Sequence, residues 1–281
     1  MTSVFTIIQR KYATAAAWRL FLNGYTDWLC ACFLHCWGRK SRFFWTVRVP
    51  LTPKNESRPV YCRSGTSDFV TFQEVFFNEE YRLAREIPAS DVKGILDLGL
   101  NVGLAARWFL SQFPEARIVG VEPDAANAAS ARRNLMAITP DSRHRVIHAF
   151  VGGESRTAFL RPSGGHHANE GTLQDAPVAG KAAIPVMTGS EVCRSAACRL
   201  DIAKIDIEGS EKELLEADVA WLRAFRWIFI EVHDPLDEPW LRTIVADRLP
   251  TWEIVETERR HAGAFLAFLR NCDPVPEQRC G

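Results

Sequence analysis

The sequence has no excess of charge of either sign, no long uninterrupted apolar run and no regular spacing of cysteine residues. Its 281 residues include 34 basic and 34 acidic side chains, so the formal net charge is zero. A neutral chain argues against a protein whose main partner is nucleic acid. The apolar stretch that begins near Tyr12 is interrupted by Arg19, Asn23 and Asp27. We therefore expect neither a signal peptide nor a membrane-spanning helix, which needs about 20 mainly apolar residues.

The eight cysteines do not form a disulfide or zinc pattern. A chain of this length can bury a sizeable core without disulfides, so we predict mainly reduced thiols and a cytoplasmic protein. Cys30, Cys32, His35 and Cys36 lie close together, but no second pair at ligand spacing follows them. Because zinc requires four converging ligands, we expect no zinc site at this segment.

Charge is nonetheless unevenly distributed along the chain. Residues 1–55 carry eight basic side chains and one acidic side chain, which leaves +7 there and −7 in the remainder. Within this segment, residues 12–37 have apolar and aromatic side chains at spacings of three and four, which predicts an amphipathic helix. We expect residues 1–55 to be a basic amphipathic appendage, partly helical and partly extended, and residues 56–281 to be the main domain. The helix is expected to pack on that domain or on a second copy of the chain. The alternative is peripheral contact with the inner membrane face through residues 1–42.

Short apolar segments alternate with amphipathic segments from Gly94 onwards. This alternation predicts an α/β fold whose mostly parallel sheet is covered by helices on both faces, and two apolar segments near the C-terminus predict an antiparallel hairpin. Residues 43–63 are expected to be extended, residues 69–86 helical in part, and residues 162–180 a loop. The predicted strands cover residues 95–99, 117–122, 146–151, 202–207, 227–233, 252–256 and 264–269.

A glycine-rich turn follows the first of the parallel strands. Gly99, Asn101 and Gly103 lie between that strand and the next helix, where glycine permits a tight turn and close approach of a ligand to the backbone. The spacing departs from the G-x-G-x-x-G pattern typical of dinucleotide sites. Asp97 precedes Gly99 by two residues, and an acid there is unfavourable for pyrophosphate. It suits the positively charged amino group of S-adenosylmethionine, so we predict this methyl donor as the cofactor and keep an NAD-linked oxidoreductase as the alternative.

An acidic residue ends the second parallel strand. Glu122 lies 23 residues after Gly99, where the ends of adjacent strands meet, and its carboxylate can accept hydrogen bonds from both ribose hydroxyls. Phe150 and Val151, at the end of the third predicted strand, are expected to complete the cofactor site.

Four chemically active side chains follow two further strands. Asp206 and Glu208 end one strand, and Glu231 and His233 end the next. The carboxyl ends of parallel strands meet at one edge of a sheet, so we expect the four to surround the transferring group. His233, Asp206 or Glu208 could accept a proton. We expect no metal here, with Mg²⁺ kept as the less favoured alternative because carboxylates are its usual ligands.

Several short segments, in this order along the chain, carry a resemblance to a known family. They are residues 63–68 (RSGTSD), 79–81 (EEY), 95–103 (ILDLGLNVG), 121–124 (VEPD), Asn134, 204–211 (KIDIEGSE) and 230–233 (IEVH). Taken together, these segments resemble the FkbM-type methyltransferases over roughly residues 60–270. Leu100 departs from the family, which more often has alanine there.

The resemblance implies a Rossmann-like methyltransferase fold with a seven-stranded sheet, and S-adenosylmethionine-dependent O-methylation of a hydroxyl on a sugar, glycan or natural product. A non-catalytic docking protein that keeps the fold is a further alternative.

Overall fold

The computed structural model describes residues 44–50, 57–63, 66–162, 171–260 and 263–273. The predicted helix over residues 12–37 and the cysteine cluster within it lie outside the described residues. The proposed membrane contact through residues 1–42 therefore stays a prediction. In the described part of the chain, no helix is long and apolar enough to cross a membrane.

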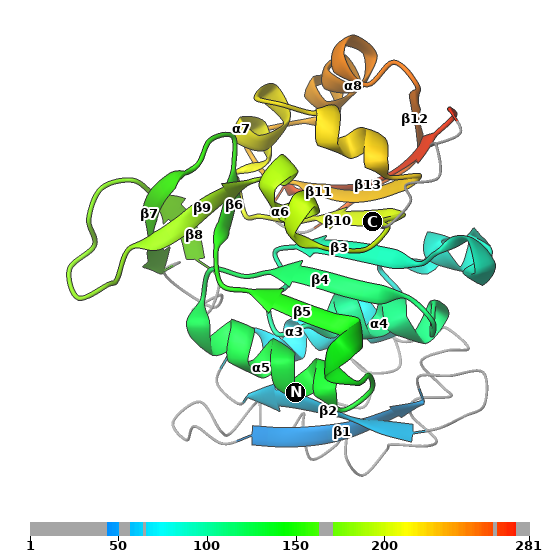
Figure 1. Cartoon of the computed structure of the whole chain (residues 1–281), viewed down its shortest axis with the longest axis vertical. Coiled ribbons are helices and arrows are strands. Elements are labelled where there is room, and N and C mark those ends of the chain that lie inside the picture. The colour runs from blue at the N-terminus through cyan, green and yellow to red at the C-terminus, as the bar shows by residue number, and fades with distance from the viewer. Residues whose placement is uncertain (1–43, 51–56, 64–65, 163–170, 261–262, 274–281) are drawn as a thin grey trace, which may run out of the picture.

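A seven-stranded sheet forms the centre of the molecule (Figure 1). Its strand order is β12-β13-β11-β10-β3-β4-β5, and the five strands β11, β10, β3, β4 and β5 run parallel. The hairpin of β12 and β13 adds two antiparallel strands at one edge. The predicted fold class is therefore confirmed. The strands are β3 (Gly94–Leu98), β4 (Arg117–Val121), β5 (His144–Ile147), β10 (Ile202–Ile205), β11 (Trp227–Val232), β12 (Trp252–Arg259) and β13 (Phe265–Asn271).

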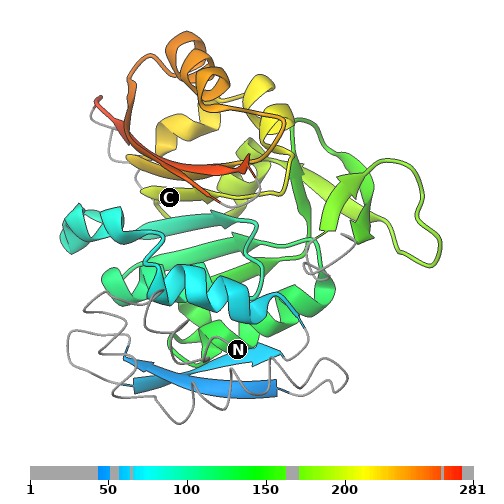
Figure 2. The ribbon, with the colours of Figure 1, turned by 180° about the vertical axis from the view of Figure 1, so that it is seen from behind.

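Helices cover both faces of this sheet, as Figures 1 and 2 show. Alternate strand residues face opposite sides: Ile95 packs with α4 (Leu104–Gln112) and α5 (Ala125–Met136), whereas Leu96 and Leu98 pack into a second core. This second core contains residues of α6 (Gly189–Ser195), α7 (Glu211–Glu216) and α8 (Glu238–Arg248). The remaining helical segments are α3 (Asp68–Phe72), the π-helix η2 (Gln73–Phe77) and the 3₁₀ helices η3 (Arg82–Glu86), η4 (Ala89–Asp91), η5 (Asp141–Arg143) and η6 (Ala220–Ala224).

Local sequence explains where several helices begin. The carboxylate of Asp124 accepts hydrogen bonds from the backbone N–H groups of Ala126 and Asn127, which caps α5 as its position predicts. Asp237 caps α8 in the same way by accepting a hydrogen bond from the N–H of Trp240. These caps fix the helices that follow the strand ends.

A second, smaller sheet lies beside the carboxyl ends of the main strands (Figure 1). It corrects two predictions. Residues 146–151 do not form one strand, because β5 ends at Ile147 and the next strand belongs to the smaller sheet. Residues 162–180 are not entirely a loop, since part of this segment pairs with a preceding strand. The sequence hides the first feature because the apolar residues continue through Ala149 to Val151. The strands are β6 (Phe150–Gly152), β7 (Arg156–Pro162), β8 (Gly171–Gln174) and β9 (Ile184–Thr188).

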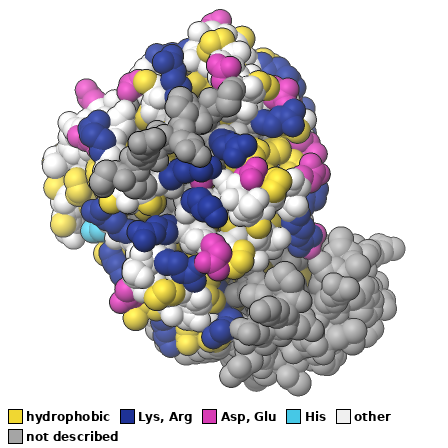
Figure 3. All heavy atoms as spheres, turned by 45° about the vertical axis from the view of Figure 1, so that its right-hand side comes forward, with side chains coloured by type: hydrophobic (Ala, Val, Ile, Leu, Met, Phe, Trp, Pro, Cys, Tyr) yellow, Lys and Arg dark blue, Asp and Glu magenta, His cyan; other side chains and the backbone are white. Residues whose placement is uncertain are grey.

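An antiparallel pair, β1 (Phe44–Pro50) and β2 (Ser57–Arg63), confirms the extended prediction and packs beside α5. Asn134 of α5 links β2 to the turn after β3. Its side chain accepts a hydrogen bond from the N–H of Tyr61 and donates to the carbonyls of Tyr61 and Val102. β1 lies before the proposed boundary at residue 55 and β2 lies after it. On one face of the molecule, Lys and Arg side chains are interspersed with Asp and Glu, in keeping with the balanced net charge (Figure 3).

Candidate active site

A cleft with an empty volume of about 550 Å³ lies at the carboxyl ends of β3, β4 and β10. This is the edge where ligands bind in open α/β sheets. Seven of the residues predicted from the sequence line it, and Asn127, which was not predicted, lines it as well. The seven are Gly99, Asn101, Glu122, Phe150, Val151, Asp206 and Glu208.

The glycine-rich turn has a backbone shape that requires glycine. Gly99 has φ +81°, and a Cβ added there would lie 1.6 Å from the carbonyl oxygen of Asp206. The N–H groups of Gly99 and Leu100 donate to the carbonyl of Val121, at 3.1 and 2.9 Å, which holds the turn against β4. Gly103, also left-handed with φ +78°, precedes the first residue of α4. The turn is thus built by backbone contacts.

Glu122 lies buried at the end of β4, with 5% of its surface exposed. Its carboxylate accepts hydrogen bonds of 2.8 Å from the N–H groups of Asn101 and Asp124, and one of 3.4 Å from the side chain of Asn127. Burial raises the pKa of Glu122 to about 7, although these hydrogen bonds act in the opposite direction. The carboxylate is therefore fixed in direction and faces the cleft.

Asp97 is fully buried behind the turn. It pairs across the sheet with Lys204, whose ammonium group lies 3.2 Å from Asp97, 3.1 Å from Asp206 and 2.6 Å from the carbonyl oxygen of Gly99. Burial raises the pKa of Asp97 to about 6, and Lys204 opposes this shift. Apart from this ion pair, neither carboxylate oxygen of Asp97 has a hydrogen-bond partner in the described part of the chain. Lys204 thus links the turn to the strand that carries Asp206.

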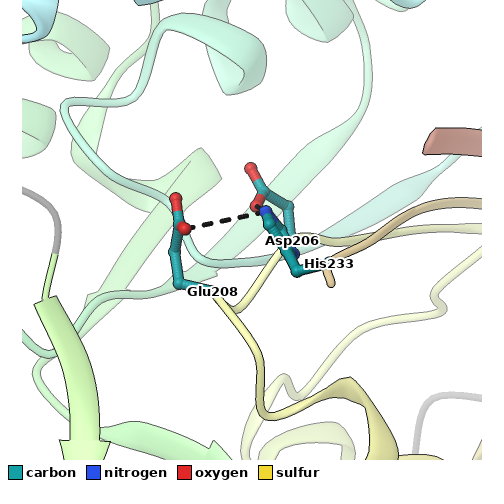
Figure 4. A group of neighbouring side chains, drawn as sticks. All are labelled: Asp206, Glu208 and His233. Atoms are coloured by element: carbon teal, nitrogen blue, oxygen red, sulfur yellow. Dashed lines mark ion pairs between the residues drawn. The ribbon is translucent and has the colours of Figure 1, made fainter. Parts of the chain in front are cut away.

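The four predicted strand-end residues converge, and we call Asp206, Glu208, Glu231 and His233 the strand-end group. The Nε2 atom of His233 lies 3.6 Å from Glu208, 3.7 Å from Asp206 and 4.0 Å from Glu231. Figure 4 shows the Glu208 and Asp206 carboxylates directed toward the imidazole. Glu208 has φ +54°, so the chain turns sharply where it leaves β10. Strands far apart in sequence thus place three carboxylates around one nitrogen.

A fifth residue orients this imidazole. Glu211 is fully buried and lies 2.9 Å from Nδ1 of His233, and its carboxylate also accepts hydrogen bonds from the N–H groups of Ile207 and Gly209. Burial lowers the pKa of His233, but the hydrogen bond with Glu211 and the charges of Asp206 and Glu208 outweigh it and raise the pKa to about 10. In this arrangement His233 carries a proton at neutral pH, so the carboxylates are better proton acceptors than the imidazole.

Burial also perturbs two further carboxyl groups near the cleft. The pKa of Glu80 is raised to about 7 by burial, and Arg260 opposes this from 3.4 Å. Burial and the charge of Asp206 raise the pKa of Glu231 well above its usual range. Perturbed carboxyl groups gathered in one cleft are typical of an active site.

Sequence reasoning missed Lys204, Glu211, Glu80 and Asn127 as members of the site. Lys204 could have been found, because a residue two positions before Asp206 lies on the same face of the strand. Glu211 looks like an acid in the first turn of a helix, and only the fold brings it to His233.

Together, the doubly wound sheet and this cleft define a Rossmann-like nucleotide-binding enzyme. A family model described as the methyltransferase FkbM domain matches residues 97–274, more than half of the chain. The chain therefore belongs to the FkbM methyltransferase family, and the resemblance recognised in the sequence is confirmed. It is an S-adenosylmethionine-dependent methyltransferase, which disfavours both the NAD-linked and the non-catalytic alternatives.

The chain is similar to one characterised methyltransferase and to several solved structures. The 2-O-methyltransferase NoeI of Sinorhizobium fredii (strain NBRC 101917 / NGR234) is 27% identical over 181 residues, covering 57% of this chain and 72% of that protein. Similar solved structures include M. capricolum TrmK in complex with S-adenosyl-homocysteine, at 9% identity and TM-score 0.45, covering 70% of this chain and 69% of that one. The methyltransferase domain of human METTL16 is 8% identical with TM-score 0.45, and the match covers 72% of this chain and 68% of that one.

The cleft also fits S-adenosylmethionine on its own geometry. Asp97, buried behind the glycine-rich turn and paired with Lys204, places a carboxyl group beside the cleft that can attract a cationic amino group. The carboxylate of Glu122 at the neighbouring strand end suits a ribose.

Proposed function

We propose that this enzyme methylates a hydroxyl oxygen of a small-molecule or glycan acceptor. The observation that carries the proposal is the strand-end group, which places three carboxylates within 4.0 Å of Nε2 of His233, with Asp206 and Glu208 lining the cofactor cleft. Carboxylates suit both the recognition of hydroxyl groups and the removal of their protons. The name of the relative NoeI, a 2-O-methyltransferase, supports oxygen as the accepting atom.

The cofactor is held, in this proposal, by the residues of the glycine-rich side. Glu122 accepts hydrogen bonds from the ribose hydroxyls, and Asp97 attracts the amino group of the amino-acid tail. The backbone of Gly99, Asn101 and Gly103 lets the ligand approach closely, and Phe150 and Val151 line the wall of the cleft.

S-adenosylmethionine supplies the methyl group from its sulfonium, and the sulfur–carbon electron pair stays on sulfur as the new oxygen–carbon bond forms. The strand-end group holds the acceptor so that one hydroxyl oxygen points at the cleft, and such positioning can contribute roughly 7–11 kcal/mol. A carboxylate of this group takes the hydroxyl proton, while Lys204 and protonated His233 keep the acidic side chains in place.

An acceptor screen tests this proposal. The full chain is incubated with S-adenosylmethionine carrying a labelled methyl group and a panel of hydroxylated glycosides, each matched with an analogue whose hydroxyls are already methylated. We expect label transfer only to members with free hydroxyls. Transfer to amines or thiols, with none to any hydroxyl, would contradict O-methylation.

A further inference from the structure

We propose that Asp206, Glu208 and His233 form a binding site for one six-coordinate divalent cation of the Mg²⁺ and Mn²⁺ class. The role given to the cation rests on the proposed O-methylation, but its binding can be measured without any acceptor. The sequence kept Mg²⁺ only as the less favoured alternative, and the geometry of the donors now favours it.

The spacing of the donor atoms suits such an ion. One oxygen of Asp206, one oxygen of Glu208 and Nε2 of His233 all lie within 4.8 Å of one another. Nε2 is 3.7 Å from the first and 3.6 Å from the second, longer than a hydrogen bond. With metal–ligand distances of about 2.1 Å, octahedral ligand atoms are about 3.0 Å apart when adjacent and about 4.2 Å apart when opposite. The three atoms therefore lie close to the separations that one octahedral ion imposes on its ligands, and Figure 4 shows the three side chains side by side.

The imidazole is oriented as metal-bound histidines are. Its Nδ1 lies 2.9 Å from the fully buried Glu211, which turns Nε2 toward the two carboxylates. Metal-ligating histidines almost always use their other nitrogen in this way. Glu211 also accepts hydrogen bonds from the backbone N–H groups of Ile207 and Gly209, which flank Glu208, so the loop after β10 carries two proposed ligands and holds the residue that orients the third.

A fourth acidic side chain adds to the negative charge at the same place. Glu231 comes within 4.0 Å of Nε2 of His233, and its side chain is only 17% exposed. With Asp206, Glu208 and Glu211, it brings four acidic side chains to within 4.0 Å of one imidazole. A cation between Asp206, Glu208 and His233 would reduce the repulsion among these carboxylates.

The donor set favours Mg²⁺ or Mn²⁺ over softer metals. Two carboxylates supply hard oxygen ligands, one imidazole is accepted by Mn²⁺ as well, and the described part of the site offers no thiolate. The cation must displace the proton from Nε2 of His233, as metals do when they bind imidazole.

A bound cation would also assign different roles to the groups of the site. It would hold the acceptor oxygen and stabilise it as the O–H bond breaks. A carboxylate that the cation does not bind would take the proton, and the oxygen electron pair would form the bond to the methyl carbon as the sulfur–carbon bond breaks.

Binding of Mn²⁺ alone tests the proposal. The full chain is treated with a chelator, desalted and titrated with Mn²⁺, while electron paramagnetic resonance reports the free ion. We expect one Mn²⁺ per chain, and affinities roughly tenfold or more weaker for Asp206→Asn and His233→Gln. Asp247→Asn, the same change on the exposed face of α8, is the control and should bind Mn²⁺ like the wild type. Thermal melting followed by circular dichroism verifies that each variant folds, and two variants are used so that one misfolded protein leaves the test intact.

Two outcomes would overturn the proposal. One is a wild-type protein that binds S-adenosylhomocysteine but no Mn²⁺ at about 1 mM. The other is a folded Asp206→Asn or His233→Gln protein with wild-type Mn²⁺ affinity. Because these measurements need no acceptor, a failure to methylate any hydroxyl would contradict the proposed function without affecting them.

Discussion

The two sides of the cleft are built in different ways. On the β3–β4 side, the glycine-rich turn is held by backbone hydrogen bonds to Val121, and a Cβ at Gly99 would collide with backbone. On the β10–β11 side, the strand-end group consists of three carboxylates that lie 3.6–4.0 Å from Nε2 of His233. The first side should therefore be sensitive to shape and the second to chemistry. Substitutions that keep the shape of a side chain but alter its functional group should therefore affect the β10–β11 side more than the β3–β4 side.

The largest effect is expected from Asp206→Asn, which keeps the shape and removes a charge. Loss of a group that positions or deprotonates the acceptor should lower kcat by about 10²–10⁴-fold. The dissociation constant for S-adenosylhomocysteine should change little, because Glu122 and the glycine-rich turn are untouched. Initial rates of S-adenosylhomocysteine formation and calorimetric titration measure the two quantities. With Asp247→Asn as the control, a variant that lost cofactor affinity in proportion to rate would show that the sides are not separate.

A methyl group added to the turn should act chiefly on folding. Gly99→Ala places a Cβ 1.6 Å from the carbonyl oxygen of Asp206 at a left-handed φ of +81°. We expect a loss of about 3 kcal/mol or more in the free energy of unfolding, measured by urea denaturation. Gly180→Ala is the matched control, because Gly180 has φ +71° with nothing within 4 Å of an added Cβ. It should lose only about 1–2 kcal/mol, and equal losses would mean that the collision does not matter.

Glu122→Gln tests the ribose contact on the same side. The amide keeps the size of the side chain but loses the charge that strengthens hydrogen bonds to hydroxyls. A loss of about 1.5–3 kcal/mol corresponds to a roughly 10–100-fold weaker affinity for S-adenosylhomocysteine. Calorimetric titration measures this change, and Glu115→Gln, an exposed acid in the turn before β4, is the control. Unchanged affinity in the Glu122 variant would remove the ribose assignment.

The same contrast explains what the sequence could predict. The glycine-rich side is contained in residues 95–122, and strand periodicity, glycine spacing and a strand-end acid all act locally there. Its geometry was therefore predictable down to Gly99, Asn101 and Glu122. The cap that Asp124 provides for α5 follows from an equally local rule, whereas the seven-stranded sheet was expected from the family resemblance.

The strand-end side depends on contacts that sequence spacing does not encode. Asp206, Glu208, Glu231 and His233 could be placed at one edge because parallel strands end there. The role of Glu211 could not be predicted, since it requires the end of β11 to meet the start of α7. The proton on His233 follows from that contact. The smaller sheet escaped prediction for the same reason: β6 pairs with β9, more than thirty residues away.

The smallest expected effect is a pH dependence of cofactor affinity. It shows which side of the cleft carries the carboxyl group whose protonation weakens cofactor binding. Burial raises the pKa of Glu122 from its ordinary value to about 7, so this carboxyl gains a proton as the pH falls through 7. The protonated form accepts hydrogen bonds poorly, and affinity for S-adenosylhomocysteine should fall up to about tenfold between pH 8 and pH 6. Asp97, with a pKa of about 6, adds its own loss mainly at lower pH.

Glu80 should gain a proton over the same pH range, since its pKa is also raised to about 7. It lies on the other side of the cleft, however, where it faces Arg260 and the strand-end group. Calorimetric titrations at pH 6, 7 and 8 should therefore show that most of the pH dependence is lost in Glu122→Gln, where only the contribution of Asp97 near pH 6 remains, and that it is retained in Glu80→Gln. Asp124, the nearest other acid, remains in both variants and serves as a constant background. If Glu80→Gln instead removed the dependence, the strand-end side would govern cofactor binding, and the separation between the two sides of the cleft would fail.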